Sequence, residues 1–155
     1  MPFSLHYTGQ TGTYRDLAGE LFEIMPTKDN KKKILIIEDD PVMLHELNEV
    51  LHRYSDYNVT SSSQGEEGLT LIQSLRPDLI LLDVMLPEID GFEICRSIQN
   101  MPVDQRPKII LLTALTPLLD KMESDWLNQT GADGLLPKPL DTNRLLSMIS
   151  ESLRK

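Results

Sequence analysis

Short runs of Val, Ile and Leu alternate with amphipathic stretches along most of this chain. The apolar runs cover residues 34–37, about 57–61, 79–83, 108–113 and 134–137, and the amphipathic stretches cover roughly 41–54, 65–75, 91–100, 117–129 and 141–153. Strands that are apolar throughout are typical of a parallel sheet with helices on both faces. The pattern predicts an α/β fold: a doubly wound five-stranded parallel sheet with five helices.

The ends of two of these helices carry recognisable signals. Asp40 precedes the first helix, where negative charge is favoured by the helix dipole, and Pro41 suits the first helical turn. Asp141 is a suitable cap for the last helix. These residues predict where both helices begin.

The residues before the first apolar run form a separate segment. Six apolar residues recur there at helical spacing: Tyr14, Leu17, Ala18, Leu21, Phe22 and Met25. This spacing predicts a short amphipathic helix from Thr13 to Met25, ended by Pro26. The charged stretch 27–33 (TKDNKKK) is a linker. We therefore expect an N-terminal extension over residues 1–31 and a main domain over residues 32–155.

Composition excludes several classes of protein. A formal net charge of −9 argues against direct binding of nucleic acid, because that affinity comes largely from Lys and Arg. Cys95 has no second cysteine to pair with, so we expect a reducing compartment. No apolar run is long enough for a membrane span, and the first residues lack the features of a secretion signal. The sequence predicts a soluble, cytoplasmic protein.

Polar side chains stand where four of the predicted strands end. The first strand runs into Glu38-Asp39-Asp40, and later strands end at Asp83, at Thr113 and just before Lys138. Ligands of open parallel sheets bind beyond the carboxyl ends of the strands, so these groups are expected to converge. Several carboxylates close together repel one another unless a cation offsets their charge, and Mg²⁺ is the usual hard cation for oxygen ligands. The arrangement is typical of a phosphoryl-transfer site.

Four segments carry a resemblance to a known family. The strings KKILIIEDDP, PDLILLDVMLPEIDGFEICR, PKIILLTAL and GADGLLPKPL closely resemble the receiver domains of two-component response regulators. The match covers about residues 32–154. It implies the flavodoxin-like receiver fold and a signalling switch operated by phosphorylation.

The resemblance also implies roles for residues of the site. Asp83 is expected to accept a phosphoryl group from a sensor histidine kinase or a phosphotransfer protein. Asp39 would bind Mg²⁺ directly, Glu38 would act through water, and Asp83 and the backbone carbonyl of Met85 would complete the protein ligands. The protein would then signal to a downstream effector protein, and it would catalyse only its own phosphorylation and dephosphorylation.

Thr113 and Lys138 are expected to respond to the phosphoryl group. The Thr113 hydroxyl would bond a phosphoryl oxygen, Lys138 would supply positive charge, and Pro139 resembles the family's cis peptide bond that directs the lysine inward. Receivers usually carry Tyr or Phe three residues before the lysine, and here that position is Leu135. The aromatic part of the switch is therefore missing. Met85 and Leu115 are both apolar, so we expect slow hydrolysis of the phosphoryl group.

Three alternatives compete with this interpretation, and the sequence argues against the first two. A phosphatase of the haloacid dehalogenase type needs a second aspartate where Met85 stands. A flavodoxin-like electron carrier needs a phosphate loop where Glu38 to Asp40 would repel phosphate. A receiver fold that acts as a phosphorylation-independent scaffold is harder to exclude. The N-terminal helix could dock on its own domain, pair two copies into a homodimer, or bind a partner.

Overall fold

The computed structural model describes residues 6–7, 13–15, 21–23, 31–54, 57–114 and 119–154. The chain divides into two compact units, Met1–Asn30 and Lys31–Lys155. No helix in the described part of the chain has the length and apolar character needed to cross a bilayer.

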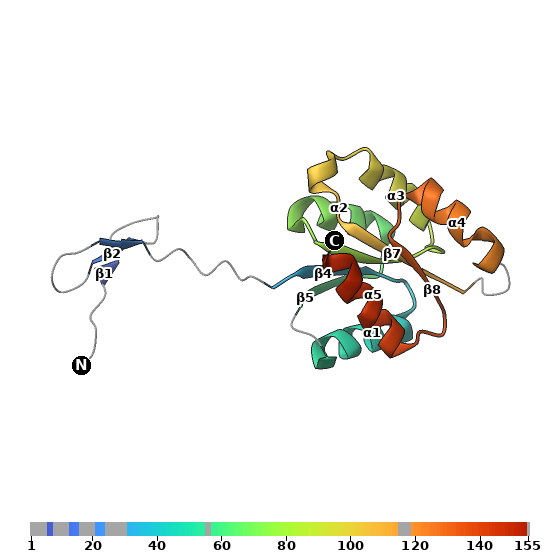
Figure 1. Ribbon diagram of the computed structural model, residues 1–155, viewed down its shortest axis with the longest axis horizontal. Helices are drawn as coiled ribbons and strands as arrows, with labels where there is room; N and C mark the ends of the chain where they lie inside the picture. Colours follow the sequence, from blue (N-terminus) through green and yellow to red (C-terminus); the bar gives the residue numbers. More distant parts are fainter. Residues whose placement is uncertain are drawn as a thin grey trace. The chain divides into compact units, whose positions relative to one another are not determined.

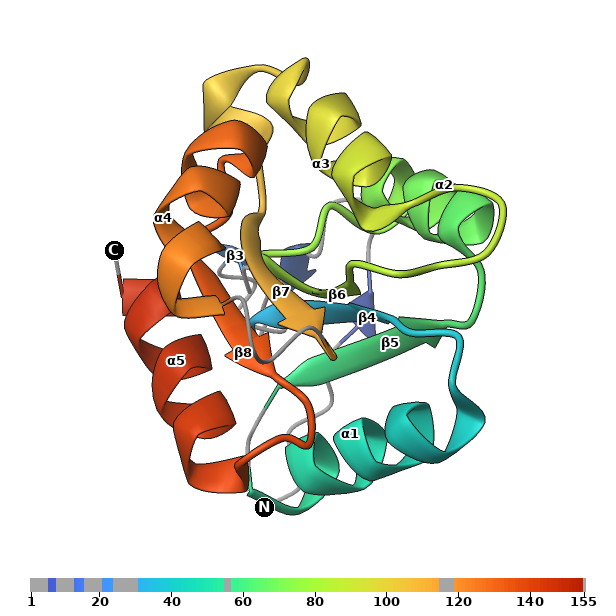
Figure 2. The ribbon, with the colours of Figure 1, turned by 90° about the vertical axis from the view of Figure 1, so that its right-hand side faces the viewer.

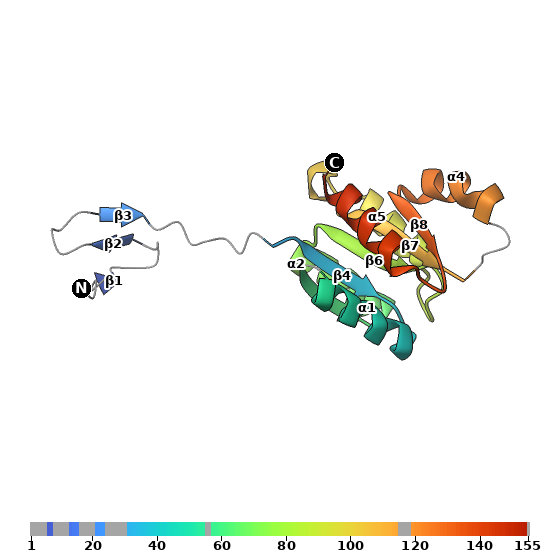
Figure 3. The ribbon, with the colours of Figure 1, turned by 60° about the horizontal axis from the view of Figure 1, so that its bottom comes forward.

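The first unit contains a small antiparallel sheet where a helix was predicted. Its strands are β1 (His6–Tyr7), β2 (Thr13–Arg15) and β3 (Leu21–Glu23). Figure 3 shows them side by side in the order β1-β2-β3. The predicted helix over Thr13 to Met25 is therefore wrong at residues 13–15 and 21–23, and its other residues lie outside the described part.

The physical reason for this error can be read from β2 and β3. Tyr14 lies opposite Phe22 in the antiparallel register, and Thr13 lies opposite Glu23. Aromatic and β-branched residues favour strands, while Gly19 within the predicted helix would cost it about 1 kcal/mol. Apolar spacing alone did not distinguish one helix from two short strands.

The second unit is the predicted five-stranded parallel sheet with five helices (Figure 1). Its strands are β4 (Lys33–Ile37), β5 (Asn58–Ser62), β6 (Leu79–Asp83), β7 (Lys108–Thr113) and β8 (Gly134–Pro137). Its helices are α1 (Pro41–Tyr54), α2 (Gly65–Leu75), α3 (Gly91–Gln99), α4 (Leu119–Thr130) and α5 (Thr142–Arg154), with a short 3₁₀ helix η1 (Val103–Gln105) before β7. The fold prediction is confirmed for this unit.

Helices cover both faces of the sheet, as Figure 2 shows: α1 and α5 lie on one face, and α2, α3 and α4 lie on the other. Alternate residues of each strand pack into the apolar cores on opposite faces of the sheet. In β4, Ile34 and Ile36 pack with α1 and α5, while Leu35 and Ile37 pack toward α2 and α3. Burial on both faces explains why the central strands are apolar throughout.

Polar caps set the starts of the helices near the site. Asp40 Oδ1 accepts a hydrogen bond of 2.9 Å from the Val42 amide at the start of α1. Asp141 Oδ1 accepts one of 2.8 Å from the Arg144 amide at the start of α5. The predicted cap at Asp141 is confirmed, and Asp40, predicted to favour the start of α1 through its charge, also caps that helix.

Candidate functional site

The predicted site lies where the order of the strands in the sheet reverses. The order is β5-β4-β6-β7-β8, so the chain crosses from one side of β4 to the other after β5. Ile37 pairs with Leu82, and the next residues along these strands are Glu38 and Asp83. The crevice beyond such neighbouring strand ends is where α/β sheets bind ligands.

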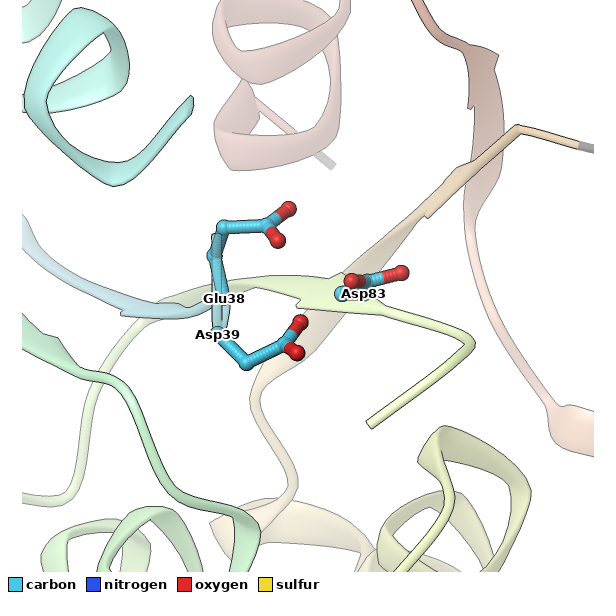
Figure 4. Close-up of side chains that lie close together, drawn as sticks. All are labelled: Glu38, Asp39 and Asp83. Atoms are coloured by element: carbon cyan, nitrogen blue, oxygen red, sulfur yellow. The ribbon is translucent and has the colours of Figure 1, made fainter. Parts of the chain in front are cut away.

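Three carboxylate groups meet in this crevice. One carboxylate oxygen from each of Glu38, Asp39 and Asp83 lies within 4.8 Å of the others. Figure 4 shows the side chains of Glu38 and Asp39 extending toward Asp83. Glu38 is fully buried and Asp83 is 4% exposed, whereas Asp39 is exposed to solvent. The acidic cluster is therefore enclosed by the protein on one side and open to solvent at Asp39.

Lys138 brings a positive charge from the far edge of the sheet. Its Nζ lies 2.7 Å from Glu38 Oε2 and 3.2 Å from Asp83 Oδ2. Its backbone amide donates a 2.7 Å hydrogen bond to the Thr113 carbonyl, and the peptide bond from Lys138 to Pro139 is cis. Residues separated by 100 positions in the sequence thus form one charged group.

Backbone amides orient two of the carboxylates. The Asp40 amide donates to Glu38 Oε1 over 3.1 Å, and the Met85 amide donates to Asp83 Oδ1 over 3.0 Å. Each carboxylate therefore has one oxygen bonded to the backbone and the other beside Lys138. Such charge-assisted bonds hold the oxygens in defined positions.

Burial and neighbouring charge shift two pKa values at the site. Desolvation raises the pKa of Glu38 to about 7, helped by the nearby charge of Asp83 and opposed by Lys138 and the Asp40 amide. Burial lowers the pKa of Lys138, but its ion pair with Glu38 and the charge of Asp83 outweigh that effect and raise it overall. Lys138 thus stays protonated, whereas burial disfavours the ionised form of Glu38.

The remaining predicted residues occupy distinct environments. Thr113 ends β7 and is fully buried, and Met85 is 61% exposed beside Asp83. Leu135 is 2% exposed and belongs to the same core cluster as Cys95 and Trp126. The position usually held by an aromatic residue is thus filled by a core leucine, while Leu115 lies outside the described residues.

Sequence reasoning missed the residues that shape the loop from Asp83 to α3. Asp90 Oδ1 accepts from the Glu93 amide and Glu93 Oε2 accepts from the Asp90 amide, which is a capping box. A Cβ on Gly91 would lie 2.6 Å from the Asp83 carbonyl oxygen and 2.9 Å from Val84 Cα. The signal was present as Asp-Gly-Phe-Glu, an acid followed three residues later by Glu before an apolar pattern.

The donor set fits a hard divalent cation. Three carboxylates face one ammonium group, and the buried Glu38 Oε2 has the ion pair with Lys138 but no hydrogen bond of good geometry. Oxygen ligands with an open, solvated side suit Mg²⁺, which retains several of its waters.

Comparison with known proteins agrees with the fold and the site. The model of the response regulator receiver domain family matches residues 34–150. The transcriptional regulatory protein AfsQ1 of Streptomyces coelicolor is 43% identical over 122 residues, which cover 79% of this chain and 51% of that protein. The DNA-binding dual master transcriptional regulator RpaA of Synechocystis is 35% identical over 123 residues, covering 79% of this chain and 49% of that protein.

Solved structures show the same similarity. The receiver domain of the sensor histidine kinase PA1611 from Pseudomonas aeruginosa has a magnesium ion in its active-site cleft; it aligns with a TM-score of 0.70 at 29% identity, over 81% of this chain and 99% of that one. A CheY-like receiver domain protein from Methanospirillum hungatei aligns with a TM-score of 0.70 at 28% identity, over 80% of this chain and 94% of that one.

The chain spans about half the length of the curated relatives that it matches. The similarity therefore concerns only a part of each of those proteins. Sheet order, the carboxylate cluster, the family model and the relatives agree, and this chain belongs to the response regulator receiver domain family, whose members serve phosphorylation-dependent signalling.

Proposed function

We propose that Asp83 accepts a phosphoryl group from a phosphohistidine of a sensor histidine kinase or a phosphotransfer protein. The observation that carries this proposal is the position of Asp83: Oδ1 is held by the Met85 amide at 3.0 Å, and Oδ2 lies 3.2 Å from Lys138 Nζ. An oriented carboxylate beside a fixed cation has the geometry that phosphoryl transfer requires.

The transfer follows from this geometry. An Asp83 carboxylate oxygen attacks phosphorus, the new oxygen–phosphorus bond forms, and the phosphorus–nitrogen bond of the donor histidine breaks with its electron pair left on nitrogen. Lys138 stabilises the negative charge on the phosphoryl oxygens, since its pKa keeps it protonated. Glu38, Asp39, Asp83 and the Met85 carbonyl would hold Mg²⁺, which supplies further positive charge opposite the phosphoryl oxygens when bound.

The response of the protein begins at Thr113. Its hydroxyl is assigned to a phosphoryl oxygen after transfer, and its backbone carbonyl is bonded to the Lys138 amide. Movement of the β7 end would therefore also affect β8. Because Leu135 is a buried aliphatic residue, we assign the signal to these strand ends and to α4 rather than to a swinging aromatic ring.

The output is a contact with a downstream effector protein. The net charge of −9 disfavours direct binding of nucleic acid by this chain, although its longer relative RpaA is a DNA-binding regulator. The same proposal includes three further points. The protein is cytoplasmic, it catalyses only its own phosphorylation and dephosphorylation, and its receiver domain begins at residue 32 after an N-terminal extension.

One experiment separates this function from a phosphorylation-independent scaffold. Acetyl phosphate or beryllofluoride with Mg²⁺ should change the fluorescence of Trp126, which is buried on α4 and is the single tryptophan of the chain. Asp83→Asn should abolish the change. Asp104→Asn, an equivalent substitution at an exposed residue of η1, should respond like the unsubstituted protein. An equal response from Asp83→Asn would refute the assignment, and no response from any form would favour the scaffold.

A further inference from the structure

A hollow of about 290 Å³ lies at the end of the sheet opposite the carboxylate site. Its lining comes from segments at the amino-terminal ends of the strands: Lys32 precedes β4, Asp78 precedes β6, and Lys108 begins β7. Arg76, directly after α2, and residues near the end of α5 complete it. The hollow is therefore built by the main sheet and is distinct from the site at Asp83.

The lining of this hollow is positive although the chain is acidic. Four cationic side chains line it, while Asp78 and Asp104 are its two carboxylates: the cations are Lys32, Arg76, Arg106 and Lys108. The whole chain carries a formal net charge of −9. The four cations outnumber the two carboxylates of the lining, and a concave surface with an excess of positive charge attracts anions.

Among the described residues, the Arg76 side chain has no hydrogen-bond or ion-pair partner. It is exposed to solvent. A cation is often placed at a helix end to neutralise its carbonyls, but the Leu75 carbonyl at the end of α2 already accepts a bond of 3.2 Å from Lys33 Nζ. The backbone of Arg76 has a φ of 48°, a conformation that favours glycine. Neither local structure nor helix capping accounts for arginine here.

The two lysines of the hollow are only loosely paired. Lys32 Nζ lies 3.8 Å from Asp78 Oδ1, and Lys108 Nζ lies 3.6 Å from Asp133 Oδ1. Asp78 uses its other oxygen to accept a 2.8 Å bond from the Lys33 amide. Exposed ion pairs at such distances contribute little to stability, so both ammonium groups are available to an anion.

We propose that this hollow binds a compact phosphate-class polyanion, such as a diphosphate or triphosphate group. The planar fork of arginine matches phosphate oxygens in two-point contact, and lysine acts as a point charge. The volume is at the lower end of the range for small-molecule sites. No aromatic side chain is among the described lining residues, so recognition rests on the phosphate groups rather than on a stacked base.

This second site would operate independently of phosphorylation. The five residues of β6 separate the Asp78 end from the Asp83 end, a span of about 17 Å. That separation exceeds the screening length at physiological salt, about 8 Å, so direct charge effects between the two ends are weak.

Calorimetric titration of the full chain with tripolyphosphate, in Mg²⁺-free buffer, tests the proposal. We expect saturable binding that weakens as salt is added. Arg76→Gly removes the unpaired guanidinium and suits the positive φ, so it should fold normally and bind at least about tenfold more weakly. The matched control Arg53→Gln removes one exposed charge from α1 and should keep the original affinity.

Three results would overturn the proposal: no binding of tripolyphosphate, an equal loss of affinity in Arg76→Gly and Arg53→Gln, or binding of a hexaglutamate peptide in preference to tripolyphosphate. Two further measurements keep the sites distinguishable. Asp83→Asn should bind tripolyphosphate normally, and Arg76→Gly should be phosphorylated normally. If the hollow did not bind tripolyphosphate, the assignment of Asp83 as phosphoryl acceptor would still stand. If Asp83 were not phosphorylated, the proposal for the hollow would still stand.

Discussion

Glu38 is a fully buried carboxyl group whose nearest positive charge is the ammonium of Lys138. Its folded-state pKa of about 7 lies above its ordinary value of 4.5. Between these values the folded protein retains a proton that the unfolded chain has lost. The contribution of Glu38 to stability therefore falls as pH rises through this window, and above about 7 the metal-free site contains a buried charge.

Mg²⁺ should therefore stabilise the protein more at about pH 8 than at about pH 5.5, because the cation offsets a charge that the proton no longer removes. The measurement is the melting temperature with and without saturating Mg²⁺ at both pH values. In Glu38→Gln, the shift in melting temperature caused by Mg²⁺ should differ less between the two pH values. Equal shifts in the unsubstituted protein would contradict this account of the site.

Met85 is exposed beside Asp83 and carries no polar group. We predict that the acyl phosphate on Asp83 is long-lived, because this side chain cannot orient an attacking water. Met85→Asn should speed decay several-fold, whereas Met85→Leu should leave the rate unchanged. The lifetime can be followed with radiolabelled phosphate, and decay of the unsubstituted form within seconds would exclude the idea.

At the scale of elements, the connection from β6 to α3 determines how the Asp83 loop is held. The Gly91 amide donates a 3.0 Å hydrogen bond to the Val84 carbonyl, and the capping box of Asp90 and Glu93 begins α3 next to it. The close approach of Gly91 to the Asp83 carbonyl leaves no room for a Cβ. The position of Asp83 thus depends on how the following helix begins.

Asp90→Ala should lower the free energy of unfolding by about 1 kcal/mol, since the Glu93 amide loses its side-chain acceptor and keeps only the longer bond of 3.2 Å to the backbone carbonyl of residue 90. Urea denaturation measures the change. Asp90→Ser retains a capping oxygen and should lose less than about 0.5 kcal/mol. Equal stability of the alanine and serine forms would show that the capping bond does not support this loop.

At the scale of the whole molecule, the chain divides into two units between residues 30 and 31. The match to the receiver family lies entirely in the second unit. Its two apolar cores involve strands and helices of that unit alone, within the described residues. The second unit therefore has the composition of an independently folding domain.

Deletion of residues 1–30 should leave a cooperatively folded receiver whose melting temperature lies within about 3 °C of the full chain. Light scattering on both forms tests whether the first unit pairs two copies. A homodimer that persists after the deletion would exclude the first unit as the pairing element. A large loss of melting temperature would show that the second unit depends on the first.

By itself, the sequence determined the α/β class, the five parallel strands to within one residue at each end, and the convergence of Glu38, Asp39 and Asp83. Buried parallel strands need continuous apolar runs, and their carboxyl ends must share one edge. Only the tertiary structure decided that Lys138 lies between Glu38 and Asp83, that Leu135 is a core residue and that residues 13–15 and 21–23 are strands. These features depend on contacts and backbone pairings between separate segments, which local periodicity does not encode.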